Sequence, residues 1–572
     1  MNRNGFSTLT AAGIGWLALA MLVILYATWK TTSGLESVMD IRFYDESYYL
    51  TQGIFHPVSS WIADYSPLYA LYYKCLSQFN LSDPIALYYA NYRVWSFVLP
   101  ALVFCVLRMS GCSWTFSLIW AIFSSCAQIN LPLWPKAGHL AMLGVAIILA
   151  GFHRLKTEPI QASLWIAGVS LCISWCRPEF LAGSVLALLF CAYHVVKKSS
   201  SFQIRIHWFL IVPLAFAVLF YFFWGFPLGE SGRGSVAFGQ HFVHNWRNIS
   251  GNTSGDPIED WVNWREIYFT VFGSSENVIQ AMVSNPLALF KHLWFNGRYL
   301  IYNSFIYFFE SGFPVRWLGL SVPVCLTVVW MAAEYFHGFD GLASVWNRAK
   351  TWFRSYGLLF FLMAVPSLLA GFLFQPRPHY ILPLFTLFLY GVGKLASAYT
   401  FPQIVEHWKF GIGAGVVVAQ LFFLPDAGAF FELKKESVQM DTQPDRKEHF
   451  GKLTTKNLNQ KNLILLLNKR DWPSNTRIFD MSTGATEYLG SQVVQCGKMG
   501  FEMNYPVLED FEGFLKKEKV NSIFLRSTIN YDHFFRNNAY WQRLRSHPEK
   551  EGWRKEAVSE WGDSLLVKKG VE

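Results

Sequence analysis

Residues 43–53, FYDESYYLTQG, contain Asp45 and Glu46 side by side among tyrosines, directly after the first long apolar run. A carboxylate at a membrane surface can act as a general base, because partial burial moves such a group toward a neutral pKa. Neighbours on a helix point about 100° apart, so one of the two would face a site while the other orients it or binds a cation. The alternative is an exposed acidic pair that caps a helix as the chain leaves the bilayer.

A second group of side chains suits an anion. Three arginines and one histidine fall in predicted external segments near a membrane interface: Arg177 in CRPEF, Arg298, and Arg377 and His379 in QPRPHY. Arginine binds a phosphate through a planar fork of N–H donors. Arg377 is the strongest candidate, because prolines on both sides fix an irregular backbone of the kind that lines cavities at membrane depth. Each arginine can instead anchor a helix end to lipid headgroups.

Histidines in external segments offer metal or acid–base chemistry. His241 and His244 are three residues apart and can bind a metal on one helical face, but no third ligand follows at a diagnostic spacing. His139 can bind a phosphate or act as an acid–base group, and it can equally be an ordinary residue at a helix start. The nine cysteines include no C-x-x-C pair, so no thiolate metal site is encoded. The sequence commits to no cofactor and leaves a divalent cation open.

The composition indicates a membrane protein. The 572 residues are 52% hydrophobic and 15% charged, whereas about a quarter of a soluble domain is charged. The net charge of +9 does not indicate nucleic acid, because the positive residues form short clusters between apolar runs. We predict an α-helical polytopic fold with about eleven transmembrane helices, since a span must cross about 30 Å of hydrocarbon. The predicted spans are 9–29, 86–107, 114–131, 138–153, 162–176, 180–196, 207–227, 315–336, 355–374, 379–397 and 408–425.

The basic loops predict an orientation. One side of the predicted spans receives Arg3, Arg108, Arg154 with Lys156, Lys197 and Lys198 with Arg205, and Arg348 with Lys350 and Arg354. By the positive-inside rule this side is cytoplasmic, so the N-terminus is cytoplasmic and its first helix is retained. The opposite side receives the external loops 30–85 and 228–314. The predicted location is the inner (plasma) membrane.

From residue 426 onward the composition becomes that of a soluble domain. The segments TRIFDMS, NSIFLRS and DSLLVKK predict strands, and LEDFEGFLKKE and AYWQRLRS predict helices. No glycine-rich phosphate loop opens any of these helices, so we do not expect the reaction centre here. The sequence therefore predicts two domains, a transmembrane catalytic domain over 1–425 and an extracytoplasmic α/β domain over 426–572.

The order of these motifs resembles that of GT-C class membrane glycosyltransferases, which include bacterial aminoarabinose and lipopolysaccharide-core sugar transferases and protein mannosyltransferases. Asp45, Glu46 and Tyr49 match the first external loop of that class. SPLYALYYK matches its Pro-Leu-Tyr segment, which ends here in Tyr69, and Arg93 matches an arginine at the head of the second span. CRPEF and QPRPHYILPLF resemble an Arg-Pro-Glu turn and a late Arg-x-x-Tyr-x-x-Pro segment. The resemblance covers about residues 1–400 and is clearest over 40–110.

The resemblance implies transfer of a sugar from a polyprenyl-phosphate donor to an extracytoplasmic lipid or cell-envelope glycan, such as lipopolysaccharide, by one inverting displacement. Asp45 would be the base and Glu46 its support. The donor phosphate would meet Arg377, His379, Arg177 and Arg298, and the substrates would meet Tyr49, Tyr69, His139, His241 and His244. One departure concerns LPLWPKAGHLAML, which contains Lys136 and His139 where many members have a second acid. A metal site that depends on that acid is therefore in doubt.

Two other functions remain as alternatives. A transporter or flippase for lipid-linked glycans would typically show paired repeats and ionisable residues at the membrane midplane, and the sequence shows neither. A glycan polymerase or ligase shares the large external loop, but its chemistry would not centre on an Asp-Glu pair in the first loop. The sequence therefore favours a glycosyltransferase whose partners are membrane lipids, a lipid-linked donor and an acceptor, without nucleic acid.

Overall fold

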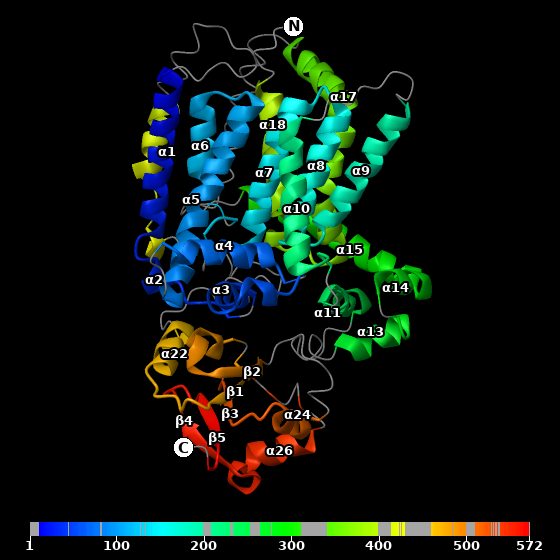
Figure 1. The fold of residues 1–572 in the computed structure, drawn as a ribbon. Coiled ribbons are helices and arrows are strands. Elements are labelled where there is room, and N and C mark those ends of the chain that lie inside the picture. Colours follow the sequence, from blue (N-terminus) through cyan, green and yellow to red (C-terminus); the bar gives the residue numbers. More distant parts are fainter. Residues whose placement is uncertain are drawn as a thin grey trace.

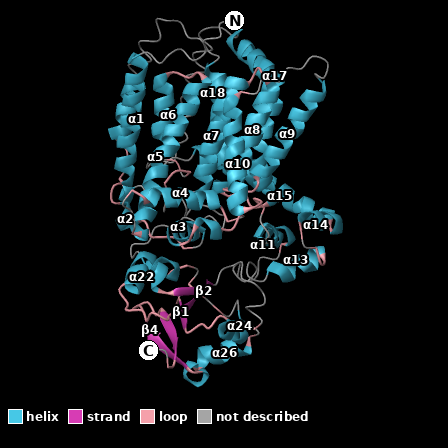
Figure 2. Cartoon of the chain, viewed as in Figure 1, coloured by secondary structure: helices cyan, strands magenta, loops and turns pink. Residues whose placement is uncertain are grey.

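The structure is a computed structural model of the chain, and helices make up most of it (Figures 1 and 2). A small sheet lies near the C-terminus. The structure describes residues 11–43, 45–63, 65–79, 83–125, 127, 129–131, 133–197, 207–228, 233–251, 264–275, 277–309, 340–397, 413–422, 424, 426–429, 459–482, 484–498, 510–527, 529, 531, 535 and 538–570.

Long helices form a bundle (Figure 1). They are α1 (Ala11–Thr32), α5 (Pro84–Ser110), α6 (Trp114–Ser125), α7 (Ala137–Leu155), α8 (Pro159–Ser174), α9 (Phe180–Lys197), α10 (Ile211–Trp224) after the short η2 (Trp208–Leu210), α17 (Asp340–Leu373) and α18 (Pro378–Ser397). Local signals explain their ends. The Asp83 carboxylate accepts hydrogen bonds from the backbone N–H groups of Ile85 and Ala86 at 3.1 and 3.2 Å, which starts α5. Gly111, with a φ of 104°, ends it.

Within the described residues, five stretches are long and apolar enough to cross a membrane: Gly13–Val38, Pro84–Ser110, Ala137–Leu155, Phe180–Lys197 and Lys350–Leu373. The prediction of a helical, polytopic membrane protein is confirmed, but the predicted number of eleven spans is not. The predicted span 315–336 lies outside the described residues. The other predicted spans coincide with helices that are shorter or less apolar, such as α6, α8, α10 and Gly413–Phe422.

Helix α17 differs most from its predicted bounds. It begins at Asp340, whereas the predicted span begins at 355. Residues 342–356 contain neither proline nor glycine, so nothing in that stretch interrupts the helix. Arg348, Lys350 and Arg354 therefore lie within a helix and not in a loop.

Further helices lie at one end of the bundle, on the side where the sheet is found (Figure 1). They are α2 (Leu35–Val38), α3 (Asp45–Phe55), η1 (Val58–Ser60), α4 (Pro67–Ser77), α11 (Arg233–Ser250), α13 (Trp264–Phe272), α14 (Val278–Ser284) and α15 (Pro286–Phe309). The ends of α5 and α18 meet at the opposite end, where the Ser397 hydroxyl donates to the carbonyl of Ser110 at 2.9 Å. Lys394 interacts there with Lys156, so this end is basic.

The C-terminal elements are α22 (Asn459–Asn468), β1 (Arg477–Asp480), η3 (Thr486–Gln492), β2 (Val494–Lys498), α24 (Phe511–Lys517), β3 (Ser522–Leu525), α26 (Ala539–Ser546), η4 (Pro548–Glu551), β4 (Trp553–Ala557) and β5 (Ser564–Lys568). The strand order is β2-β1-β3-β5-β4. Strand β1 pairs in parallel with β2 and β3, whereas β5 pairs antiparallel with β3 and β4. The predicted strands coincide with β1, β3 and β5. The two that the sequence pattern missed, β2 and β4, are the edge strands, whose polar residues weaken the signal.

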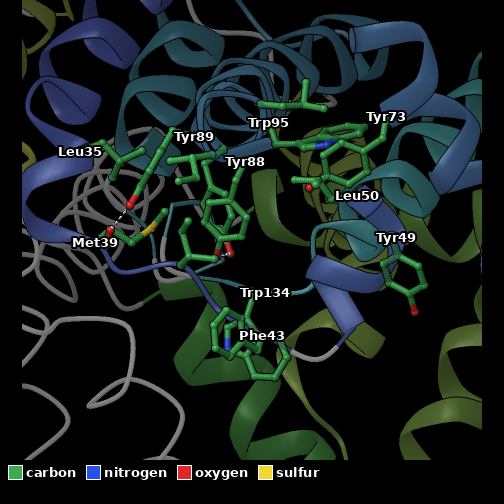
Figure 3. Packing of buried hydrophobic residues seen from close by; sticks show 14 of the residues in the cluster. Leu35, Met39, Phe43, Tyr49, Leu50, Tyr73, Tyr88, Tyr89, Trp95 and Trp134 are labelled. Atoms are coloured by element: carbon green, nitrogen blue, oxygen red, sulfur yellow. Dashed lines mark hydrogen bonds between the residues drawn. The ribbon is translucent and has the colours of Figure 1, made fainter. Parts of the chain in front are cut away.

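One buried cluster joins the C-terminal elements to the bundle. It contains Leu463 and Ile464 of α22 together with Phe43, Tyr88 and other side chains near the start of α3 and α5. Figure 3 shows its part around Phe43 and Tyr88, where the Tyr89 hydroxyl donates to the Met39 carbonyl at 2.8 Å. The C-terminal elements therefore pack directly on the segment that leads into α3.

Candidate active site around helix α3

Helix α3 has three faces, because successive residues step by about 100° around its axis. Glu46 faces the bundle, Ser47 and Thr51 face the C-terminal elements, and Asp45 and Tyr49 share the third face. Figure 3 shows Tyr49 pointing away from Leu50 and Tyr73. The helix begins at Asp45 with both acids in its first turn, where the helix dipole favours negative charge.

Glu46 is completely buried. Its Oε1 accepts hydrogen bonds from the Tyr69 hydroxyl at 2.7 Å, from Asn91 Nδ2 at 2.9 Å and from the Tyr73 hydroxyl. Its Oε2 accepts the backbone N–H of Lys136 at 2.7 Å. Burial raises the pKa of the Glu46 carboxyl, and these donors oppose the rise without reversing it. Glu46 therefore holds α3 against the bundle. Tyr69 is one of the buried partners of this carboxyl.

Lys136 and His139 are also buried, next to this network. The Lys136 ammonium donates to the Asn130 carbonyl, lies 3.5 Å from His139 Nε2 and sits 4.8 Å from the centre of the Tyr92 ring. Burial lowers the pKa of Lys136 to about 7, and the Glu46 carboxylate opposes that shift. His139 therefore lies inside the bundle end, beside the polar network around Glu46.

Asp45 is the accessible member of the acidic pair, with 43% of its side chain exposed. Arg233 Nη2, at the start of α11, lies 3.2 Å from Asp45 Oδ1 and 3.5 Å from the Tyr49 hydroxyl. The guanidinium stacks 4.1 Å above the centre of the Tyr65 ring. Burial raises the pKa of Tyr49 to about 12, so this phenol keeps its proton at neutral pH. A carboxylate that is held in place and still exposed has the geometry that a general base needs.

Arg177 lies in the turn between α8 and α9. Its Nε donates to Glu179 Oε1 at 2.8 Å, and its guanidinium stacks 4.3 Å from the centre of the Tyr380 ring. Only 11% of its side chain is exposed. Its Nη2 atom is buried and has no hydrogen-bond partner among the described residues. A charged donor in that condition is costly unless a ligand accepts from it.

Arg377 and His379 lie where α17 passes into α18. Arg377 Nε donates to Gln375 Oε1 at 3.1 Å. His379 is 5% exposed, and its ring lies 4.3 Å from that of Tyr380. Close packing of α7 fixes this position, because a Cβ on Gly138 would come within 2.6 Å of the His379 carbonyl oxygen.

Tyr380 connects the separate parts of the site. It interacts electrostatically with Arg177, Arg377, Glu179 and Asp45. The turn after α8 therefore meets the start of α18 at Tyr380, and the Asp45 carboxylate on α3 is close enough to act on this ring electrostatically. Two hydrogen bonds secure the turn to the start of α4: the Ser66 hydroxyl donates to the Cys176 carbonyl at 2.7 Å, and the Leu68 N–H donates to the Trp175 carbonyl at 3.2 Å.

The remaining candidate residues lie at different distances from this place. His241, on α11, is buried with its ring 6.3 Å from Tyr380 and 5.8 Å from Phe374. His244 is half-buried one turn further along α11, and Arg298 is exposed on α15. Across the described parts of the chain, no group of three or more His, Cys, Asp or Glu side chains is arranged to hold a metal ion.

Sequence reasoning missed several residues of the site. Glu179 and Tyr380 stand inside CRPEF and QPRPHY, so a search for partners within each motif would have found them. Arg233 lies in a stretch rich in glycine and serine and gives no local signal. Arg93, which matches an arginine of the GT-C pattern, forms an ion pair with Glu36 at 2.5 Å, and both side chains are part-exposed.

No protein family matches the chain, and no curated protein matches it. Among solved structures, the Archaeoglobus fulgidus oligosaccharyltransferase complex with Zn and sulfate is similar with a TM-score of 0.34 and 11% identity, over 89% of this chain and 67% of that chain. The apo form of that enzyme is similar with a TM-score of 0.34 and 10% identity, over 91% of this chain and 70% of that chain. A likeness at this level establishes neither a shared fold nor a family.

Proposed function

We propose that this chain is an integral membrane glycosyltransferase that moves a sugar from a polyprenyl-phosphate donor to an extracytoplasmic lipid or cell-envelope glycan. The observation that carries the proposal is the buried Arg177, which stacks on Tyr380 next to Arg377, with the accessible carboxylate of Asp45 within electrostatic reach of that ring. Such a site offers a carboxylate that can act as a base and arginines that can bind an anion. The weak likeness to the oligosaccharyltransferase agrees with this activity and carries none of the argument.

Arg177 supports a phosphate as the anion. Glu179 and Tyr380 hold its guanidinium, and the buried Nη2 atom remains for a further acceptor beyond the described residues. A phosphate oxygen suits that atom, because arginine binds phosphate through directed N–H donors. Arg377 and His379 supply further positive charge or donors at the start of α18.

The reaction would be a single displacement. Asp45 accepts the proton of the acceptor hydroxyl while the hydroxyl oxygen attacks the anomeric carbon of the donor. The bond between that carbon and the phosphate oxygen breaks, and its electron pair leaves with the polyprenyl phosphate, whose negative charge Arg177 and Arg377 stabilise. Attack from the side opposite the phosphate inverts the anomeric carbon. Glu46 contributes by fixing α3 and does not exchange the proton.

The proposed orientation follows from charge. The basic bundle end with Lys156 and Lys394 would be cytoplasmic, and α3, the site and residues 426–572 would lie outside. The proposed location is the inner (plasma) membrane.

A binding experiment with polyprenyl phosphate tests the donor site without knowledge of the sugar. The full chain in detergent should bind polyprenyl phosphate more tightly than polyprenol, which lacks the charge. Arg177→Gln should weaken phosphate binding by about tenfold or more, the typical effect of one charge-assisted hydrogen bond. Arg470→Gln is the matched control, because Arg470 also pairs with a glutamate, Glu556, but in the C-terminal elements.

Mass spectrometry of envelope lipids and glycans, with and without the gene, tests transfer itself. A transferase adds the mass of one sugar to an acceptor, whereas a transporter or flippase changes where a lipid is found and not its mass. Equal affinity for polyprenol and polyprenyl phosphate, or unchanged acceptor masses, would overturn the proposal.

A further inference from the structure

The face of α3 that carries Ser47 and Thr51 is covered by residues from the far end of the chain. The Ser47 hydroxyl donates to the Arg42 carbonyl at 2.8 Å. Its hydrogen is thereby used, so the Tyr488 hydroxyl, 2.8 Å away, is the donor in the bond between them. One turn further along α3, Thr51 Oγ1 lies 3.4 Å from Glu487 Oε2.

The last turn of α3 packs against the same 3₁₀-helix, η3. Phe55 lies directly against Gly490, where an added Cβ would come within 2.5 Å of the phenyl ring. Gly490 also has a φ of 55°, a conformation that suits glycine. A side chain at this position would therefore separate η3 from α3.

Hydrogen bonds also join the segment before α3 to the start of α22. Asp40 is buried, and its Oδ2 and Oδ1 accept the backbone N–H groups of Gln460 and Lys461, each at 2.9 Å. Gln460 Oε1 in turn accepts the backbone N–H of Phe43 at 3.2 Å. Asp40 thus caps a helix about 420 positions away, and a cap of this kind stabilises the helix start.

We propose that residues 459–482 and 484–492 act as a clasp that fixes the rotation of α3 about its own axis and so positions Asp45, with Tyr488 as the positioning residue. Glu46 holds the bundle side of α3, the clasp holds a second side, and the third side carries Asp45, whose side chain is 43% exposed. This inference rests on the proposed function, because it assigns a role in that same site.

A small rotation would matter for catalysis. A side-chain tip lies about 5–6 Å from a helix axis, so a rotation of about 20° moves it by about 2 Å. Misplacement by about 1 Å can reduce a reaction rate on the order of 10²-fold. Arg177 and Arg377 lie on other elements, so donor binding does not depend on this rotation.

Tyr488→Phe tests the clasp, because it removes the hydroxyl and keeps the ring. We expect kcat of the full chain to fall by about tenfold or more, while KM for donor and acceptor stays within about twofold. Tyr540→Phe is the matched control. Its hydroxyl accepts the Trp553 indole N–H at 3.2 Å, and both residues belong to the C-terminal elements, so kcat should stay unchanged. Ser47→Ala, which removes the acceptor, should reproduce the loss if Tyr488→Phe does not fold.

Hydrogen–deuterium exchange of residues 45–55 in the full chain provides a readout that does not need activity. The amides of α3 should exchange faster in Tyr488→Phe and Ser47→Ala than in the wild type, and not in Tyr540→Phe. A wild-type chain that transfers no sugar would overturn the proposed function, while the exchange data would still decide the clasp. An active wild type whose Tyr488→Phe variant matches it in kcat and exchange would overturn the clasp alone.

Discussion

Arg233 Nη2 lies 3.2 Å from Oδ1 of Asp45, although 188 positions separate the two residues in the chain. The guanidinium is itself held by the Tyr65 ring. This ion pair joins the start of α11 to the face of α3 that carries Asp45 and Tyr49. Neighbouring Glu46, in contrast, is completely enclosed. Two acids that are adjacent in the sequence therefore have different surroundings.

Asp45→Asn should reduce sugar transfer by about 10²–10⁴-fold, the usual contribution of a positioned general base. The amide keeps the shape of the side chain but cannot take up the proton that the hydroxyl group of the sugar acceptor loses. Donor binding should persist, because Arg177 and Arg377 lie on other elements. Transfer rate and donor affinity should be measured separately on the purified variant.

Asp83→Asn is the control for that substitution, since Asp83 is an acid that only caps α5. An asparagine still accepts backbone N–H bonds, so melting temperature and transfer should both change little. Near wild-type transfer by a folded Asp45→Asn protein would rule out Asp45 as the base.

Glu46→Gln should destabilise the chain most at low pH. Burial raises the pKa of Glu46 above its ordinary value of 4.5, so the folded state holds this proton more tightly than the unfolded state does. The stability that Glu46 contributes is therefore present below pH 4.5 and is lost as pH rises through the folded-state pKa. Glutamine does not titrate, and its amide N–H group replaces an oxygen that accepts a hydrogen bond in the wild type. This mismatch should lower the free energy of unfolding by about 1–3 kcal/mol.

The ordinary pKa of the carboxyl is 4.5. The difference in melting temperature between wild type and Glu46→Gln should therefore shrink as pH rises above this value. Thermal unfolding in detergent at several pH values measures it. A gap that widens over that range would contradict a raised pKa.

Arg377→Ala should weaken donor binding far more than Arg298→Ala. Arg377 interacts with Tyr380 at the centre of the site, whereas Arg298 is exposed on α15. The loss at Arg377 should be about 1.5–3 kcal/mol, or roughly tenfold or more in Kd. Titration of both variants with polyprenyl phosphate gives the comparison, and equal small losses would move the donor site away from the start of α18.

A topology reporter fused near Lys516 should report a position outside the cytoplasm. The basic residues at the far end of the bundle predict that residues 426–572 lie on the opposite side of the membrane from Lys156. A reporter that is active only in the cytoplasm should stay silent there, and the same reporter placed near Lys156 should be active. A strong signal near Lys516 would reverse the orientation and remove the extracytoplasmic site.

Much of the architecture could be predicted from local patterns. Apolar runs predicted the bundle helices, because a helix of about 20 residues is what the hydrocarbon core requires. Buried strands β1, β3 and β5 were predictable from their apolar residues, whereas the edge strands were not. The 100° step of a helix also predicted that Asp45 and Glu46 would face different surroundings.

The sequence by itself thus determined that the protein is a helical membrane protein and where the central strands β1, β3 and β5 of its C-terminal sheet lie. It also determined that Asp45 and Glu46 point in different directions. Only the tertiary structure decided which acid is accessible, because burial depends on partners such as Lys136 and Arg233 that lie far along the chain. It also decided that Arg177 and Tyr380 stack and that Tyr488 covers α3. These contacts are non-local: they depend on how whole helices pack, and no short window of residues contains that information.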